Sequence, residues 1–107
     1  MSVSKKRKRK IICNHQEYIW YIREDRYYDG AFFNDYVTPW ALHIVSIDKK
    51  LILYVPVGVK KPYILGHIQF KLLPKQYFLP FDIPEIITPK FVDYFITWVN
   101  ENLTKNH

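Results

Sequence analysis

Two stretches of this chain are apolar at every position, and they constrain its fold more than any other feature. They span residues 18–22 and 51–55, and their length and their content of aromatic and branched residues favour β-strands. Neighbouring side chains of a strand point to opposite faces of the sheet, so a strand without polar positions needs cover on both faces. The sequence therefore predicts a sheet that requires two covering layers.

The first apolar stretch belongs to a predicted β-hairpin near the N-terminus. Strands 9–13 and 17–24 are joined at Asn14-His15, because asparagine readily adopts the left-handed turn conformation. A turn of two residues places Arg9 opposite Trp20, in position for a cation–π contact.

The second hairpin joins strands 40–47 and 51–57 through a tight turn at 48–50. Between the hairpins, residues 25–39 combine turn formers with aromatic side chains and are predicted to form a long loop. Tyr-rich loops recognise proteins well, because their rings give contact area at a low entropic cost. We therefore assign protein interaction to five rings of this loop, with burial over an open sheet face as the alternative. These rings are Tyr27, Tyr28, Phe32, Phe33 and Tyr36.

The end of the chain predicts an amphipathic helix. Thr88 is a good N-cap, and Pro89 suits the first helical position. Apolar residues then recur at helical spacing over about 15 residues, a length that crosses a four-stranded sheet. The apolar stripe consists of Phe91, Val92, Phe95, Ile96, Val99 and Leu103.

The segment before this helix is rich in proline, with five of the seven prolines between positions 62 and 89. Because proline disfavours central strands and helix interiors, we predict extended chain with one short edge strand at 63–72. Residues 60–88, together with the loop at 25–39, are one candidate cover for the second sheet face. The other candidates are a sheet curled into a half-barrel and contact with another chain.

These elements predict an α+β fold: an antiparallel sheet of four or five strands from two hairpins, with one C-terminal amphipathic helix on one face. The chain of 107 residues forms one domain, at 8–107, after a flexible basic arm at 1–7. Its single Cys13 excludes an intrachain disulfide. With neither a signal peptide nor a membrane span recognised, we expect a cytoplasmic protein, or a nuclear one in a eukaryote.

Six consecutive basic residues near the N-terminus account for the net charge of +6. Such a dense arm neutralises phosphates in a salt-dependent manner, and in a eukaryote it also resembles a nuclear import signal. The alternative is a solvated arm whose last charges protect an exposed edge strand from aggregation. A nucleic-acid site would combine the cations with rings that stack on bases. Its candidate residues are Lys5, Lys6, Arg7, Lys8, Arg9, Lys10, Trp20 and Tyr21.

The sequence offers few candidates for catalysis or metal binding. The four histidines lack metal-ligand spacing, and one cysteine excludes a cysteine-based zinc site. Cations near Cys13 favour a lowered thiol pKa, but a packed, inert side chain is the favoured interpretation. No helix follows a Gly-rich turn, so we predict neither a phosphate cradle of that type nor a cofactor.

Asp48 and the later Gln69-Phe70-Lys71 resemble the spaced acid and (Glu/Gln)-x-Lys of the PD-(D/E)xK nuclease family. The resemblance implies that the acid and the amide hold Mg²⁺ and that Lys71 assists the attacking water. It covers these positions alone, and strands and loop are predicted before Asp48 where the family has a helix. A hairpin turn is the alternative role for Asp48.

The sequence thus favours a small non-enzymatic binding domain that acts through protein–protein contact or self-association as a dimer, without a membrane. A nucleic-acid-binding protein anchored by its basic arm, on DNA or RNA, is the alternative. A Mg²⁺-dependent nuclease is the third hypothesis.

Overall fold

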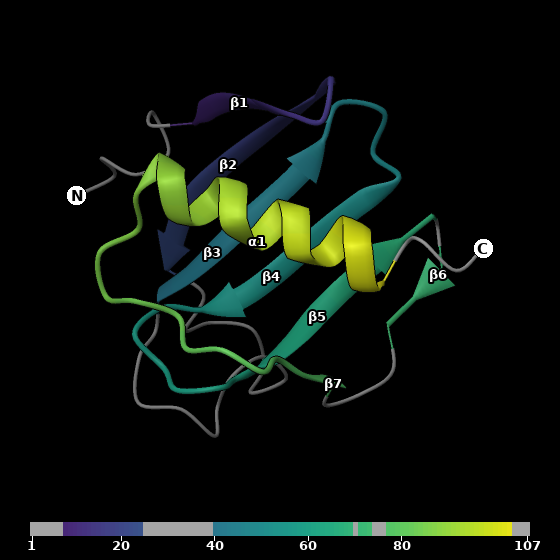
Figure 1. The fold of residues 1–107 in the computed structure, drawn as a ribbon. Helices are drawn as coiled ribbons and strands as arrows, with labels where there is room; N and C mark the ends of the chain where they lie inside the picture. Colours follow the sequence, from purple (N-terminus) through teal and green to yellow (C-terminus); the bar gives the residue numbers. More distant parts are fainter. Residues whose placement is uncertain (1–7, 25–39, 70, 74–76, 104–107) are drawn as a thin grey trace.

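Two layers make up the described part of the chain: an antiparallel sheet and one helix that lies across it (Figure 1). The computed structural model describes residues 8–24, 40–69, 71–73 and 77–103. The predicted arm at 1–7 and loop at 25–39 lie outside these residues. The elements are β1 (Arg9–Cys13), β2 (Gln16–Glu24), β3 (Trp40–Ser46), β4 (Leu51–Pro56), β5 (Tyr63–Ile68), β6 (Lys71–Leu72), β7 (Tyr77–Phe78) and α1 (Pro89–Asn102).

The predicted α+β class is confirmed, with an antiparallel sheet and one C-terminal helix. Strands β1 to β6 follow one another across the sheet, and β7 pairs with β5. The sheet has more strands than the four or five that the sequence predicted. The strands that were not predicted separately, β6 and β7, contain only two residues each. Strands that short leave no periodic pattern in a sequence.

The first hairpin has the predicted turn and pairing. Asn14 and His15 both have positive φ, 52° and 67°, which matches the turn type that suits the right-handed twist of paired strands. Arg9 pairs with Trp20. The guanidinium carbon of Arg9 lies 5.5 Å from the centroid of the indole, so the predicted cation–π contact is confirmed.

The second hairpin is closed by Ser46, the last residue of β3. Its hydroxyl donates a hydrogen bond of 2.7 Å to Asp48 Oδ1 and accepts one of 3.0 Å from the backbone N–H of Leu51. Lys49, between them, has a φ of 64°. The predicted tight turn is confirmed, and the buried hydroxyl finds partners within the turn itself.

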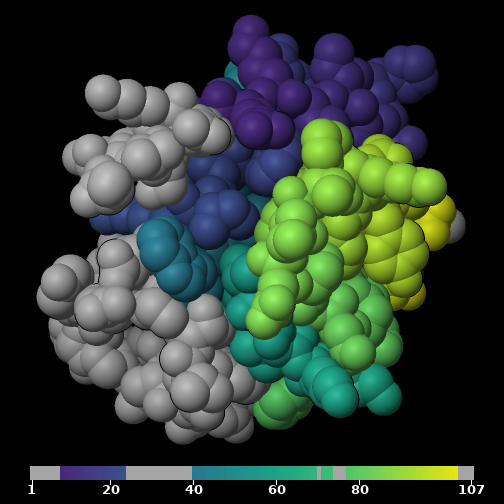
Figure 2. Space-filling model, turned by 90° about the vertical axis from the view of Figure 1, so that its left-hand side faces the viewer, coloured from purple at the N-terminus to yellow at the C-terminus, as the bar shows by residue number. Residues whose placement is uncertain are grey.

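Helix α1 begins and packs as its sequence predicts. The Thr88 hydroxyl accepts a hydrogen bond of 3.2 Å from the backbone N–H of Phe91, and Pro89 is the first helical residue. Four side chains of the predicted stripe are fully buried against the sheet: Val92, Phe95, Ile96 and Val99. The first turns of the helix lie beside β1 (Figure 2). The strands contribute Tyr18, Trp20, Leu42, Ile44, Leu53, Val55 and Ile64 to this helix-side core.

One prediction for the Pro-rich segment 60–88, its edge strand at 63–72, is wrong for most of its length. The predicted edge strand contains β5, which lies inside the sheet between β4 and both β6 and β7. Pro62 precedes this strand, and no proline interrupts its hydrogen bonds. Cover of the second face by this segment was one of three alternatives, and its residues Leu79 and Ile83 are instead buried in the helix-side core.

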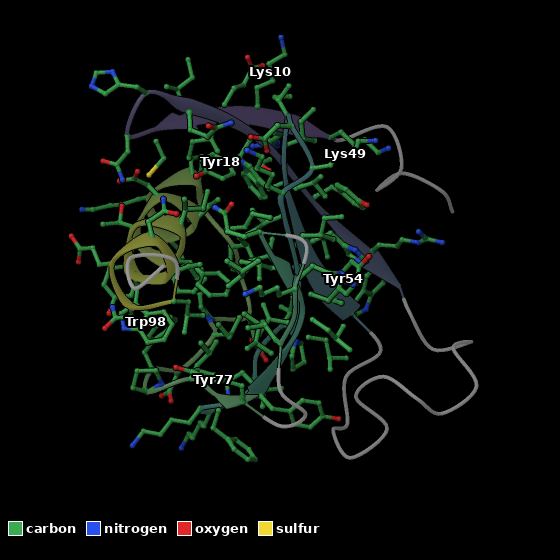
Figure 3. The ribbon with its side chains drawn as sticks, turned by 90° about the vertical axis from the view of Figure 1, so that its right-hand side faces the viewer. Lys10, Tyr18, Lys49, Tyr54, Tyr77 and Trp98 are labelled. Carbon is green, nitrogen blue, oxygen red and sulfur yellow. The ribbon has the colours of Figure 1, made fainter. Side chains whose placement is uncertain are left out.

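The second face of the sheet, opposite α1, is lined by the alternate residues of the same strands (Figure 3). Ala41, His43 and Tyr63 are buried there, whereas Tyr54 and Leu65 are partly buried. The sheet is not closed into a barrel. The two faces of β4 therefore contribute to two separate clusters, because Leu51, Leu53 and Val55 belong to the helix-side core and Tyr54 packs on the cluster of the second face.

We predict that the backbone at Gly66 tolerates no side chain. Its φ is +142°, and a Cβ atom would clash with the carbonyl oxygen of Ile52 in the neighbouring strand. Gly58 is the matched control: its φ is +75°, but a Cβ atom there first meets the flexible side chain of Glu85, at 3.0 Å. We expect Gly66→Ala to lower the free energy of unfolding by at least about 3 kcal/mol and Gly58→Ala by about 1 kcal/mol. Urea denaturation measures both, and equal losses would contradict this account.

Candidate interaction surfaces

The described cations of the predicted nucleic-acid site are Arg9 and Lys10 in β1 and Lys8 directly before it. Among the described strands, β1 pairs only with β2. Lys8 Nζ lies 5.1 Å from the centroid of the Tyr21 ring, and Lys10 Nζ lies 3.4 Å from Glu17 Oε2. Because side chains alternate along a strand, Lys8 and Lys10 lie on the second face and Arg9 lies on the helix side. All three cations are exposed.

The two rings of the predicted nucleic-acid site point to opposite faces of the sheet. Trp20 is 4% exposed and belongs to the helix-side core, so its indole offers no open face to a base. Tyr21 is partly buried on the second face and stacks on His43, with centroids 4.8 Å apart and an interplanar angle of 7°. His43 in turn meets Tyr54 edge to face, with ring centroids 4.7 Å apart. The three rings therefore form a row on the second face. The structure thus brings Lys8 and Tyr21 together and separates them from Trp20.

The rings predicted for protein interaction, within 25–39, lie outside the described residues. A different cluster, which we call the aromatic ridge, consists of Phe81, Phe91, Tyr94 and Trp98. Phe81 is its centre: the distances from its ring centroid are 6.3 Å to Phe91, 5.2 Å to Tyr94 and 5.4 Å to Trp98. The rings meet edge to face, at interplanar angles of 71° to 79°, which is a favourable geometry for aromatic pairs.

The ridge forms where the segment before α1 passes along one flank of the helix (Figure 1). Residues 91, 94 and 98 follow one another at spacings of three and four and therefore share a side of the helix. Phe81 reaches this side because Leu79 and Ile83, two positions before and after it, are buried. The rings cap the edge of the core and stay partly open to solvent, with Tyr94 52% exposed.

Sequence reasoning missed the ridge. The apolar stripe that predicted the helix contains Phe91 but neither Tyr94 nor Trp98, which lie beside it. The aromatic spacing at 91, 94 and 98 was the available signal. Phe81 carried no signal of its own, since it lies outside the helix and its contacts depend on the path of the Pro-rich segment.

The positions that resemble the PD-(D/E)xK motif lie in two neighbouring turns. The Asp48 carboxylate accepts hydrogen bonds from the Ser46 hydroxyl and the Lys50 backbone N–H, which lower the pKa of Asp48 in that order of importance. The backbone N–H of Gln69 donates to the carbonyl oxygen of Lys50 at 2.7 Å, and Lys71 is exposed at the start of β6. Asp48 thus has the turn role that was the alternative. Among the described residues, no three His, Cys, Asp or Glu side chains are grouped to hold a metal ion.

Cys13, the last residue of β1, contacts helix α1. Its Sγ lies 3.3 Å from the Thr97 hydroxyl and 3.9 Å from the backbone carbonyl oxygen of Asp93, which accepts from it. Burial is the main cause that raises the pKa of the Cys13 thiol above its ordinary value. The nearby cations of β1 therefore do not produce an activated thiolate, in agreement with the packed role favoured from the sequence.

Comparison with known proteins yields no relative: no family model, curated protein or solved structure matches this chain. Within the described residues, the helix is too short to span a bilayer.

We predict that Cys13 reacts slowly with thiol reagents in the folded protein. Its buried, protonated thiol reacts only when β1 separates from α1, so alkylation near pH 7 should be at least about tenfold slower than in denaturant. The matched control is Ile12→Cys in a Cys13→Ser background, because residue 12 is 72% exposed on the same strand. That control should react at similar rates in both conditions. Equal rates for native and denatured Cys13 would show that the thiol is accessible.

Proposed function

We propose that this protein is a small binding domain that contacts another polypeptide through the aromatic ridge. The observation that supports the proposal most is the exposure of rings beside a core that is already closed. Val92, Phe95, Ile96 and Val99 attach the helix to the sheet and are fully buried. Tyr94 and Trp98 extend beyond them, and tyrosine and tryptophan are the residues most enriched among the anchors of protein interfaces.

The packing within the ridge favours recognition. Phe81 makes edge-to-face contacts with Phe91, Tyr94 and Trp98, and also with the buried Phe95 at 5.7 Å. Each such pair contributes about 0.5–1.5 kcal/mol beyond the area that it buries. The rings are therefore held in place before a partner arrives, and a partner that covers them loses little conformational entropy. A segment with apolar side chains is the complementary partner.

A random peptide library displayed on phage tests whether the ridge binds polypeptides. We predict that selected peptides carry aromatic or aliphatic residues and bind the wild-type protein at least about tenfold more tightly than Tyr94→Ser, which loses the most exposed ring of the ridge. Tyr94→Phe retains the ring and should retain binding. Ile12→Ser removes an exposed apolar side chain elsewhere and should have no effect. The proposal would be refuted if the selection enriched no peptide, or if every selected peptide bound Tyr94→Ser as tightly as the wild-type protein.

A second candidate function, nucleic-acid binding, is favoured by the arrangement of β1 and β2 on the second face. Lys8, Lys10, Tyr21 and Arg23 share that face, and Lys8 lies over the tyrosine ring. In the sequence, Lys5, Lys6 and Arg7 directly precede these residues. Cations beside a ring match the way single-strand binders hold phosphates and stack bases.

The salt dependence of binding tests this second candidate. We predict that the protein binds a single-stranded oligonucleotide at low salt and that affinity falls steeply as salt rises. A triple variant of Lys5, Lys6 and Arg7 to serine leaves β1 intact and should reduce the slope of log K against log [salt] by about 2. Fluorescence anisotropy measures the slope, with Lys60→Ser/Lys61→Ser on the β4–β5 turn as the control for loss of positive charge elsewhere on the surface. No binding at low salt, or an unchanged slope, would eliminate this candidate.

A further inference from the structure

The side of α1 that points away from the sheet carries a short stripe of four residues. Lys90, Tyr94 and Glu101 are exposed on it, and Trp98 is partly buried at its border with the ridge. Their spacings of four, four and three place them on one side of the helix. The buried residues of α1, at positions 92, 95, 96 and 99, lie on the opposite side of the helix.

The two charges of this stripe oppose the helix dipole. Lys90 is the second residue from the start of α1, and Glu101 is the second from its end. Helix N-termini favour carboxylates and C-termini favour cations, yet α1 has no acidic residue in its first turn and no basic residue in its last. Both charges are therefore placed unfavourably for a helix on its own.

The same order of charges is favourable in an antiparallel pair of identical helices. A two-fold axis near the middle of α1 brings residue 90 of each copy opposite residue 101 of the other. Lys90 then faces Glu101 and also approaches the negative end of the neighbouring helix dipole, and Glu101 approaches the positive end. The same symmetry brings Tyr94 of each copy within one residue of the level of Trp98 of the other, an axial offset of about 1.5 Å. The stripe is thus complementary to itself, as an interface around a two-fold axis requires.

We propose that the polypeptide that binds the aromatic ridge is a second copy of this chain, held by antiparallel pairing of α1 with α1. The inference rests on the proposed function, since it names the partner of that surface. A helix of 14 residues is about 21 Å long. A contact of that length buries less than the roughly 1,200–2,000 Å² of stable complexes, so the dimer dissociates on dilution.

Sedimentation equilibrium over a range from about 1 µM to about 1 mM tests the pairing. The wild-type protein should change from monomer to dimer within this range. Lys90→Glu and Glu101→Lys should each weaken the dimer at least about tenfold, because each places like charges opposite each other twice. An equimolar mixture of the two variants should form a heterodimer at least as tight as the wild-type dimer. The double variant Lys90→Glu/Glu101→Lys should dimerise again.

Loss of folding does not explain the expected weakening. Each single substitution brings the helix into line with its dipole, so thermal unfolding of the monomeric variants should occur at an unchanged or higher temperature. Ile12→Glu adds a charge on β1, far from the stripe in sequence and on the second face, and should leave the dimer unchanged.

Three results would overturn the inference. The protein could remain monomeric at every concentration, both charge variants could dimerise as tightly as the wild-type protein, or the mixture of variants could associate no more tightly than each variant alone. The peptide selection separates this failure from that of the proposed function. If peptides depend on Tyr94 while the protein remains monomeric, the ridge binds a different polypeptide and self-association alone is wrong. If the selected peptides do not depend on Tyr94 and the protein also stays monomeric, both proposals are wrong.

Discussion

The packing of α1 on the sheet determines the position of the aromatic ridge and of the charged stripe on the helix. Val92, Phe95, Ile96 and Val99 are fully buried, and together they fix the rotation of the helix about its axis. With that rotation fixed, the flank at 91, 94 and 98 meets Phe81, and the opposite flank meets β1 and β2 through Cys13–Thr97 and Tyr18–Asn100 hydrogen bonds. One flank is therefore aromatic and the other polar. A substitution that rotated the helix would disrupt both flanks together.

The two faces of the sheet, both of which carry apolar residues, are covered in different ways. On one side, α1 and residues 79–83 form a continuous core with the strands. On the other side, Tyr21, His43 and Tyr54 form a row of rings across β2, β3 and β4, which ends at Lys8 over Tyr21. Rings suit this side because they pack on one another through their faces and edges.

The parts of the fold that the sequence predicted are those set by local chemistry. Asn14-His15 specifies its turn through backbone conformation, and Thr88-Pro89 specifies a helix start through one hydrogen bond. The parts that it missed depend on contacts distant in sequence. In a strand that is apolar at every position, alternation does not reveal which residues face the helix, so Trp20 and Tyr21 were assigned to one site although they point to opposite faces. The side of the sheet that residues 79–83 cover depends on contacts with a helix that follows them, and the same contacts create the ridge.

The two candidate functions use different sides of the molecule and are physically compatible. The ridge lies on the helix side, whereas Lys8, Lys10 and Tyr21 lie on the second face at the β1 edge. A dimer formed through α1 would leave both of these edges outside its interface. Two cationic edges in one particle bind a long polyanion more tightly than one, because the first contact raises the effective concentration of the second. Self-association through the ridge would thus strengthen binding by the basic residues, and each surface gains a physical role from the other.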